Sequence, residues 1–477
     1  MKAIFEKSLV GIVALAAAMP TPMIAQTVNA SAAVTKQSPP VGGPPKPFTV
    51  PAHQDFTLRN GLKVTLIPYG NVPKVTANVI VRSGSINEAE NQVWLADLLG
   101  DLMKEGTKTR TAEQVAAEAA GMGGALEVAV GADQTQITSD ALSEFGAKMI
   151  ALLADVIQNP SLPESELPRL KKDALRTLSI QLSTPGQIAR QHFAKLLYPD
   201  HPYGRLFPTE TLVNSYTIEE VRKFYDTNFG AVRTHVYIAG KFDPAAIRKA
   251  VEGSFGNWPR GGEPQINVPK PNPGHAFDLA DRPGALQSTI YLGVPVIKPS
   301  DPDYIPFKVM DSLLGGSFGS RITANIRESK GYAYSPSSGI LTHDHDATWV
   351  EVADVRTDVT GPSLKEIFYE IQRLENEPPP AAELKGIQEY LSGIFVLQNS
   401  TRQGIIGQLN FLELQGLGEQ FLQAYVQRVN AVTPEQVSAV ARKNLVLDQV
   451  KIVVVGDKEK IAEQVRPYVS AVIQKHN

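Results

Sequence analysis

The sequence of 477 residues contains no cysteine. This absence excludes disulfide bonds, zinc sites built on thiolates, a thiol nucleophile and a lipid attached to cysteine. An excess of positive charge is also missing, because 46 Lys and Arg residues stand against 49 Asp and Glu residues and the formal net charge is -3. A protein that binds nucleic acid would show a basic excess or stripe, so we expect no nucleic-acid partner.

Long apolar runs are scarce, and the one near the N-terminus is short. It covers residues 9–19, follows two lysines and precedes a series of small residues. This order is typical of a secretory signal peptide, and the run is too short for a helix that spans a bilayer. We therefore predict a signal peptide over residues 1–32 and export to the periplasm or secretion, with a buried N-terminal helix as the alternative. Cleavage would follow one of three alanines, Ala25, Ala30 or Ala32. Since no later stretch approaches about 18 uninterrupted apolar residues, we expect no membrane span in the mature chain.

The composition, with 43% hydrophobic and 20% charged residues, is that of a globular protein long enough for at least two domains. Two stretches rich in Pro and Gly divide the chain, a predicted tether over residues 33–53 and a predicted linker over residues 259–276. The predicted domains between and after them span residues 54–258 and 277–477.

The second domain repeats the order of features found in the first. "HVYIAGKF" in the first half corresponds to "KIVVVGDK" near the C-terminus, which places Gly240 and Gly456 216 residues apart. Similarly, "LADLLGDL" corresponds to "VMDSLLGG", with 214 residues between Asp97 and Asp311. This constant spacing indicates a duplicated domain. Both halves mix hairpins with separate helices, so the predicted fold class is α+β, with two α/β-sandwich domains that each pair a mostly antiparallel sheet with helices on one face.

One predicted helix, "WLADLLGDLMKEGT" over residues 94–107, carries an unexpected pair of charges. Its leucines recur at the spacing of one apolar helix face. Asp97 and Asp101 lie four residues apart on a neighbouring stripe, where two like charges repel and add nothing to helix stability. The helix pattern alone does not explain them.

Five segments in a fixed order carry a resemblance to a known family. They are "TLRNGLKVTLIP", "VRSGS", the helix that ends in "KEGT", "YPDHPYGR", and "GGSFGSRITANIRESKGYAYS". Together they resemble the inverted zincins, the family of pitrilysin, insulinase and the mitochondrial processing peptidases, over about residues 55–472. The resemblance implies that the two domains form half of a clamshell that encloses a peptide substrate.

The resemblance also assigns a role to the aspartate helix. In the family, H-x-x-E-H on this helix supplies two zinc ligands and the general base. Here "DLLGD" places Asp97 and Asp101 at the two histidines and Gly100 at the base, while Asp173 stands at the third ligand. No H-x-x-E-H occurs elsewhere in the chain, so this chain is expected to hold no zinc. The alternative is that Asp97, Asp101 and Asp173 bind Ca²⁺, Mg²⁺ or Mn²⁺, which prefer oxygen ligands.

The second half keeps the family's other functional pair. The resemblance implies that Arg327 and Tyr334 bind the substrate backbone and stabilise the oxyanion, and that Gly315, Gly316 and Ser317 contact substrate. Alternatively, Arg327 pairs with a local carboxylate such as Glu328, and Tyr334 is buried by its ring. In the first half, Glu127 replaces the family's usual asparagine before its substrate-pairing strand, which weakens the case for peptide binding there.

Three further motifs have simple structural interpretations. His343 and His345 in "THDHD" could form a metal pair, but their position between two strand-like runs favours a solvated hairpin tip. "GGSFGSR" lacks the Gly-Lys-Ser/Thr of a phosphate-binding loop. His201 in "DHPYG" is expected to be a structural loop residue.

These observations favour a non-catalytic subunit of an exported, two-subunit zinc metallopeptidase. The partner subunit would carry H-x-x-E-H and the zinc, and this chain would add Arg327 and Tyr334 to the active site. One alternative is a structural or peptide-binding scaffold of the same fold, in which Arg327 and Tyr334 have no role. Another is a carboxylate-metal hydrolase that uses the three aspartates.

Overall fold

In the computed structural model, the described residues are 48–470. The predicted signal peptide and the predicted tether as far as residue 47 lie outside them. The described residues fall within one compact unit. Within the described part of the chain, no helix combines the length and apolar character needed to cross a membrane.

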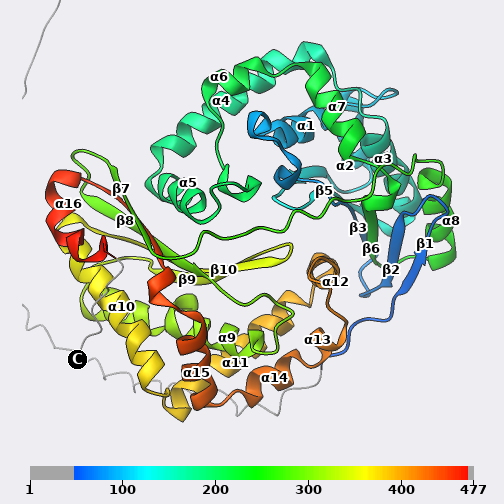
Figure 1. Cartoon of the computed structure of the whole chain (residues 1–477). Helices are drawn as coiled ribbons and strands as arrows, with labels where there is room; N and C mark the ends of the chain where they lie inside the picture. Colours follow the sequence, from blue (N-terminus) through cyan, green and yellow to red (C-terminus); the bar gives the residue numbers. More distant parts are fainter. Residues whose placement is uncertain (1–47, 471–477) are drawn as a thin grey trace, which may run out of the picture. The chain divides into compact units, whose positions relative to one another are not determined.

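The first half of the chain builds a six-stranded sheet (Figure 1). Its order is β1-β2-β6-β3-β5-β4, and only the β2–β6 pair is parallel. The strands are β1 (Gln54–Thr57), β2 (Lys63–Pro68), β3 (Lys74–Val81), β4 (Leu126–Val130), β5 (Thr135–Leu142) and β6 (Thr234–Gly240). The hairpin predicted around Asn60 and Gly61 is present, and Gly61 has the positive φ (93°) that such turns require.

The second half builds a five-stranded sheet with the order β7-β11-β8-β10-β9. Its strands are β7 (Ala276–Asp281), β8 (Gln287–Pro295), β9 (Ser337–His343), β10 (Asp346–Arg356) and β11 (Lys451–Gly456). Only β7 and β11 are parallel. Without β1, the first sheet has the same arrangement, with a parallel pair at one side and antiparallel strands at the other. This correspondence confirms the predicted α+β class and the duplicated domain.

Helices accompany each sheet. Those of the first half are α1 (Leu95–Met103), α2 (Ala112–Gly121), α3 (Gly146–Gln158), α4 (Leu167–Ser183), α5 (Pro185–Leu197), α6 (Glu210–Ser215), α7 (Ile218–Asn228) and α8 (Pro244–Phe255). Those of the second half are α9 (Tyr304–Asp311), α10 (Thr360–Asn376), α11 (Ala381–Gln398), α12 (Arg402–Leu414), α13 (Gln420–Gln423), α14 (Tyr425–Ala431), α15 (Pro434–Asn444) and α16 (Lys458–Val465). Between α8 and β7, residues 256–275 contain neither helix nor strand, in the region of the predicted linker.

Each sheet also receives a helix from the other half of the chain. Helix α5 packs on β8 and β11 of the second sheet (Figure 1). There, Phe193 contacts the ring of Tyr291. Helix α12 packs on β3 and β6 of the first sheet. The prediction of helices on one face therefore holds for the helices of the same half. The opposite face is covered by the exchanged helix, which buries apolar strand residues there.

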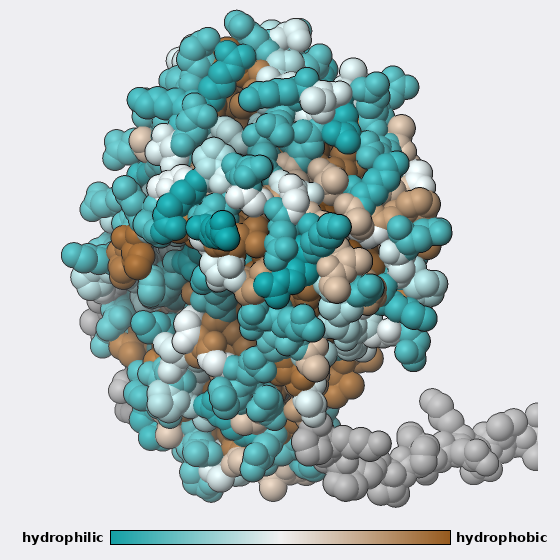
Figure 2. Space-filling model, turned by 90° about the vertical axis from the view of Figure 1, so that its right-hand side faces the viewer, coloured by the Kyte–Doolittle hydropathy of each residue, from teal (hydrophilic) through white to brown (hydrophobic). Residues whose placement is uncertain are grey.

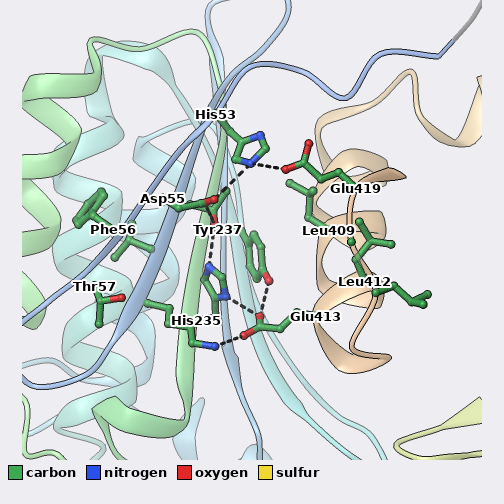
Figure 3. A pocket seen from close by; sticks show the side chains of 15 residues that line it. His53, Asp55, Phe56, Thr57, His235, Tyr237, Leu409, Leu412, Glu413 and Glu419 are labelled. Atoms are coloured by element: carbon green, nitrogen blue, oxygen red, sulfur yellow. Dashed lines mark hydrogen bonds and ion pairs between the residues drawn. The ribbon is translucent and has the colours of Figure 1, made fainter. Parts of the chain in front are cut away.

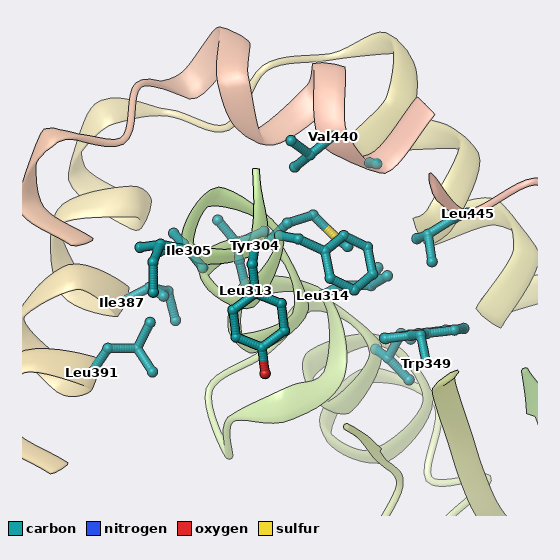
Figure 4. Close-up of a cluster of buried hydrophobic side chains, with 14 of the residues drawn as sticks. Tyr304, Ile305, Leu313, Leu314, Trp349, Ile387, Leu391, Val440 and Leu445 are labelled. Atoms are coloured by element: carbon teal, nitrogen blue, oxygen red, sulfur yellow. The ribbon is translucent and has the colours of Figure 1, made fainter. Parts of the chain in front are cut away.

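The apolar core of the second half surrounds helix α9 and the segment that follows it. Tyr304, Ile305, Leu313 and Leu314 pack here with Trp349 of β10 (Figure 4). On the surface shown in Figure 2, hydrophilic residues predominate and apolar ones are scattered between them, as is usual for globular proteins.

The β9–β10 hairpin tip corrects one prediction from the sequence. The hairpin is present, but its tip is only partly solvated, because it docks on the first half and leaves His345 exposed. Asp344 is buried and accepts a hydrogen bond from Arg82, and the ring of His343 stacks on Tyr203 at 4.1 Å. His343 Nδ1 also lies 3.5 Å from Asp133 Oδ2. His345 occupies the turn with φ 65°, so the two histidines do not share a strand face.

A second charged cluster joins the halves beside α12. His235 Nδ1 lies 2.6 Å from Glu413 Oε2, and the same oxygen accepts a hydrogen bond from Tyr237 at 2.6 Å (Figure 3). Lys63 donates to the other Glu413 oxygen at 2.8 Å. Burial acts to raise the pKa of Glu413, but the hydrogen bonds and charges of His235, Lys63 and Tyr237 outweigh it and hold this pKa well below its usual range.

Candidate functional site

The predicted aspartate helix is α1, and it has the expected apolar face. Its four leucines, Leu95, Leu98, Leu99 and Leu102, are buried. On another side of the helix, Asp97 and Asp101 line a cavity of about 180 Å³ together with Asp173 of α4. The structure therefore brings together the three aspartates that the family resemblance assigned to one site.

Basic side chains pair with two of the aspartates that line this cavity. Asp101 accepts a hydrogen bond from Lys104 at 2.7 Å. Asp173 is paired with Arg169 at 3.2 Å and with Arg176 at 3.1 Å. Within residues 48–470, no three His, Cys, Asp or Glu side chains are arranged to hold a metal ion. A metal ion bound by the three carboxylates would therefore have to displace these basic side chains.

Asp97 is the aspartate without such an ion pair among the described residues. Its side chain reaches solvent at the mouth of the cavity, yet the surrounding protein removes much of the water from its carboxylate. Desolvation, followed by the like charge of Asp101, raises the pKa of Asp97 to about 6.

Gly100 occupies the place of the general base, and the structure shows how little room is left there. A Cβ atom at this position would lie 2.7 Å from Cγ2 of Val130 and 3.6 Å from Cγ1 of Val128. Both valines belong to β4, the edge strand that also carries the exposed Glu127. Because β4 packs against α1 at this glycine, a longer side chain would have to displace Val130.

The start of α1 is held by residues that the sequence analysis did not single out. Glu88 is buried and accepts a hydrogen bond from the Ala96 N–H at 2.8 Å. Burial raises the pKa of Glu88 to about 8, against the opposing effect of this hydrogen bond and with a contribution from Asp97. The "YPDHPYGR" segment adds Arg205, which donates to the Glu88 carbonyl at 2.8 Å. No motif marks Glu88, because its role depends on its position beside the helix terminus.

His201 of the same segment has the structural role that was predicted. It is buried, its Nδ1 accepts a hydrogen bond from the Tyr203 N–H at 3.3 Å, and its Nε2 lies 3.1 Å from the Asn267 carbonyl. Both ring nitrogens are therefore used to hold the loop.

In the second half, Arg327 lies inside a π-helical segment, η8 (Thr323–Ser329), and Tyr334 follows this segment. Gly331 ends this segment with φ 62°, as its sequence position predicted. The guanidinium of Arg327 lies 5.0 Å from the centre of the Tyr334 ring. The ring of Tyr334 is 77% exposed, so the alternative of a tyrosine buried by its ring is wrong. The other part of that alternative holds, since Arg327 Nε lies 3.2 Å from Glu328 Oε1.

Phe318 completes this group and was missed by the sequence analysis. Its ring is 72% exposed, and its centre lies 4.6 Å from the Arg327 guanidinium. The guanidinium is thus in contact with two aromatic rings, an arrangement that limits its rotation through cation–π attraction. Among the described residues, neither Arg327 nor Tyr334 lines the aspartate cavity. The signal available in the sequence was an aromatic residue inside a glycine-rich segment.

The predicted substrate-contacting residues Gly315, Gly316 and Ser317 precede Phe318. The two glycines end a π-helical segment, η7 (Ser312–Gly316), which continues from α9. A Cβ atom at Gly315 would lie 2.7 Å from Glu351 Oε2, and one at Gly316 would lie 2.7 Å from Asp311 Oδ2. Close packing on two acidic side chains therefore requires glycine at both positions.

Comparison with known proteins gives matches to one peptidase family. Residues 64–207 match the family "Insulinase (Peptidase family M16)", and residues 215–391 match "Peptidase M16 inactive domain". An uncharacterized zinc protease of Rickettsia bellii is 26% identical over 67% of this chain and 77% of its own length.

Two solved structures share the fold. A peptidase M16 inactive domain from Pseudomonas fluorescens has a TM-score of 0.78 and 22% identity, over 85% of this chain and 98% of the other. A protease from Helicobacter pylori has a TM-score of 0.80 and 19% identity, over 86% of this chain and 100% of the other.

Proposed function

The chain belongs to peptidase family M16, and we propose that it is the non-catalytic subunit of an exported, two-subunit zinc peptidase. In this assembly the partner subunit carries H-x-x-E-H, binds the zinc ion and activates water. This chain encloses part of the substrate and contributes hydrogen-bond donors to the partner's active site.

The observation that carries the proposal is the contrast between the two halves. In the first half, glycine replaces the general base, and two of the three ligand positions hold aspartates that are paired with Lys104, Arg169 and Arg176. A zinc peptidase needs a carboxylate to accept the proton of the bound water, and glycine has none. In the second half, Arg327 and Tyr334 are both present and close together.

The proposed role of the pair follows from its chemistry. The Tyr334 hydroxyl and the Arg327 guanidinium are donors, and a peptide carbonyl gains negative charge on its oxygen when water attacks it. Donors fixed in place before the reaction stabilise that charge without reorganisation. Phe318 supports the role because its ring, like that of Tyr334, contacts the guanidinium and limits its movement.

Isolation of the native complex tests the proposal. The full chain, carrying a C-terminal affinity tag, is produced with its own N-terminus in its native host and purified from the exported fraction. We expect a similar-sized protein with H-x-x-E-H to co-purify, and we expect peptide cleavage by the pair but by neither subunit alone. Stoichiometric zinc and peptide cleavage by the purified chain alone would contradict the proposal.

A further inference from the structure

Two consecutive glycines rest on two buried acidic side chains in the second half. A Cβ atom added at Gly315 would lie 2.7 Å from a carboxyl oxygen of Glu351, and one added at Gly316 would lie 2.7 Å from a carboxyl oxygen of Asp311. The two carboxyl groups therefore pack directly against the segment 315–317, and we call them its floor. Ser338 of β9 completes this floor, since a Cβ at Gly315 would lie 2.6 Å from its hydroxyl oxygen.

Asp311 and Glu351 differ in the number of hydrogen-bond donors that they contact. Asp311 Oδ1 accepts hydrogen bonds from the Ser338 hydroxyl at 2.6 Å and from the Trp349 indole N–H at 2.8 Å. Lys308 on α9 also acts on Asp311 as a nearby positive charge. Glu351 is 0% exposed, and neither of its carboxyl oxygens has a hydrogen-bond partner among the described residues.

This difference decides which acid carries the negative charge. A buried carboxylate is costly unless it is paired or hydrogen-bonded, and a second carboxylate nearby increases the cost. Burial raises the pKa of Glu351 well above its usual range, and the charge of Asp311 adds to this effect. Burial also raises the pKa of Asp311, but its two donors and the charge of Lys308 oppose this effect. Asp311 is therefore the better site for the charge, while Glu351, which has no donor among the described residues, is held as the neutral acid.

We propose that Glu351 is a positioning residue whose neutral form supports the segment 315–317, and that its ionisation under alkaline conditions displaces this segment. The groups that face it are Gly315 from η7, Ser338 from β9 and Asp311 from α9, with Lys308 beyond Asp311. Lys308 is half-buried, with its Nζ 5.3 Å from the centre of the Tyr425 ring, and its positive charge acts on Asp311. An ionised Glu351 would therefore face a like charge without a compensating donor.

The displaced segment leads directly to the proposed reaction site. Ser317 is followed by Phe318, whose ring contacts the Arg327 guanidinium. Movement of the segment would withdraw this ring and release the arginine. The consequence for catalysis rests on the proposed function, but the displacement itself does not, because it takes place within this chain.

The test uses the purified full chain without a partner. Trp349 reports on the acid pair, because its indole donates to Asp311 and because it is buried, and the sequence has only three tryptophans. A Trp349→Phe variant shows how much of the tryptophan fluorescence comes from Trp349. Tryptophan fluorescence emission is measured from pH 6 to about pH 10. Hydrogen exchange of residues 312–320 is measured over the same range and corrected for the intrinsic exchange rate.

For the natural sequence we expect a reversible change in Trp349 emission on the alkaline side. Exchange in this segment should become at least about tenfold faster over the same range, as in a local opening. Glu351→Gln keeps the shape without an ionisable group and should abolish both changes. Should a buried amide impair folding, Glu351→Met removes the polar group altogether and should abolish them as well.

Glu389→Gln, on the exposed surface of α11, is the matched control and should leave both changes intact. The inference is overturned if the natural sequence shows no change, or if either Glu351 variant retains it. Neither of these results would contradict the proposed function. Conversely, failure to find a partner subunit would not contradict the inference about Glu351.

Discussion

The guanidinium of Arg327 lies 5.0 Å from the centre of the exposed ring of Tyr334. Two residues seven positions apart thus lie side by side, because Gly331 turns the chain between them. Arg327 also pairs with Glu328 at 3.2 Å, but a structural tyrosine would bury its ring. The exposure of Tyr334 is instead suited to contact with another molecule.

Phe318 should influence activity through Arg327. In the reconstituted pair, Phe318→Leu removes the ring but keeps apolar bulk, so it should lower kcat/KM about threefold to fivefold, the value of an exposed cation–π contact. Phe318→Tyr keeps the ring and should behave like the natural sequence. If Phe318 acted only through its apolar bulk, Phe318→Leu would leave kcat/KM unchanged. Steady-state kinetics on both variants distinguish that outcome from a cation–π contact with Arg327.

Gly100 should resist attempts to rebuild the zinc motif. In the combination Asp97→His, Gly100→Glu and Asp101→His, the new glutamate must displace Val130, which a Cβ alone would approach at 2.7 Å. We expect a loss of about 1–3 kcal/mol in the free energy of unfolding, typical of overpacking, with some zinc binding and little peptidase activity.

Val130→Ala should recover part of the lost stability of that variant, which chemical denaturation measures. Zinc-dependent turnover close to that of an active family member would show that the loss of these three side chains alone explains the missing activity.

Asp97→Asn should stabilise the chain at neutral pH. The folded-state pKa of Asp97 is raised to about 6 from 3.8, so ionisation between these values costs stability as the pH rises. Because the side chain reaches solvent, we expect a gain of about 1 kcal/mol or less above pH 6, and none below pH 4. Asp101→Asn loses an exposed pair with Lys104 and should shift stability by no more than about 0.5 kcal/mol. If this account were wrong, denaturation at a series of pH values would show that Asp97→Asn changes the free energy of unfolding by the same amount at every pH.

Glu413→Gln should weaken the contact between the halves. The folded-state pKa of Glu413 is held below its usual range, so its contribution is present above the unfolded value of about 4.3 and is lost as the pH falls. At pH 7 we expect a loss of about 1–3 kcal/mol, because His235, Lys63 and Tyr237 lose a charged acceptor. Glu419→Gln, at a more exposed position beside His53, should cost less. Equal effects of both substitutions in thermal denaturation would contradict this assignment.

Features that depend on short-range pattern were predictable from the sequence. The buried leucines of α1, the turn at Gly61 and the break at Gly331 follow from periodicity and from backbone freedom within a few residues. The duplicated fold was predictable because Gly240 and Gly456 repeat at a constant spacing and end the equivalent strands β6 and β11.

Features that depend on distant contacts were not predictable. The exchange of α5 and α12 between the sheets and the docked tip at Asp344 pair residues that are far apart in the chain. Glu88 and Glu351 look like ordinary surface glutamates in the sequence, and only the folded chain shows that both are buried. Phe318 likewise gains its significance from the position of Arg327.

The central claim is that this chain adds a catalytic hydrogen-bond donor to a partner's zinc site. The most direct measurement is kcat for the reconstituted pair with Tyr334→Phe, which removes one exposed hydroxyl and keeps the ring. We expect normal assembly and a fall in kcat of about 100-fold to 1,000-fold, as for the loss of an oxyanion donor. A pair that assembles normally and turns over at the rate of the natural sequence would contradict the claim and identify the chain as a scaffold.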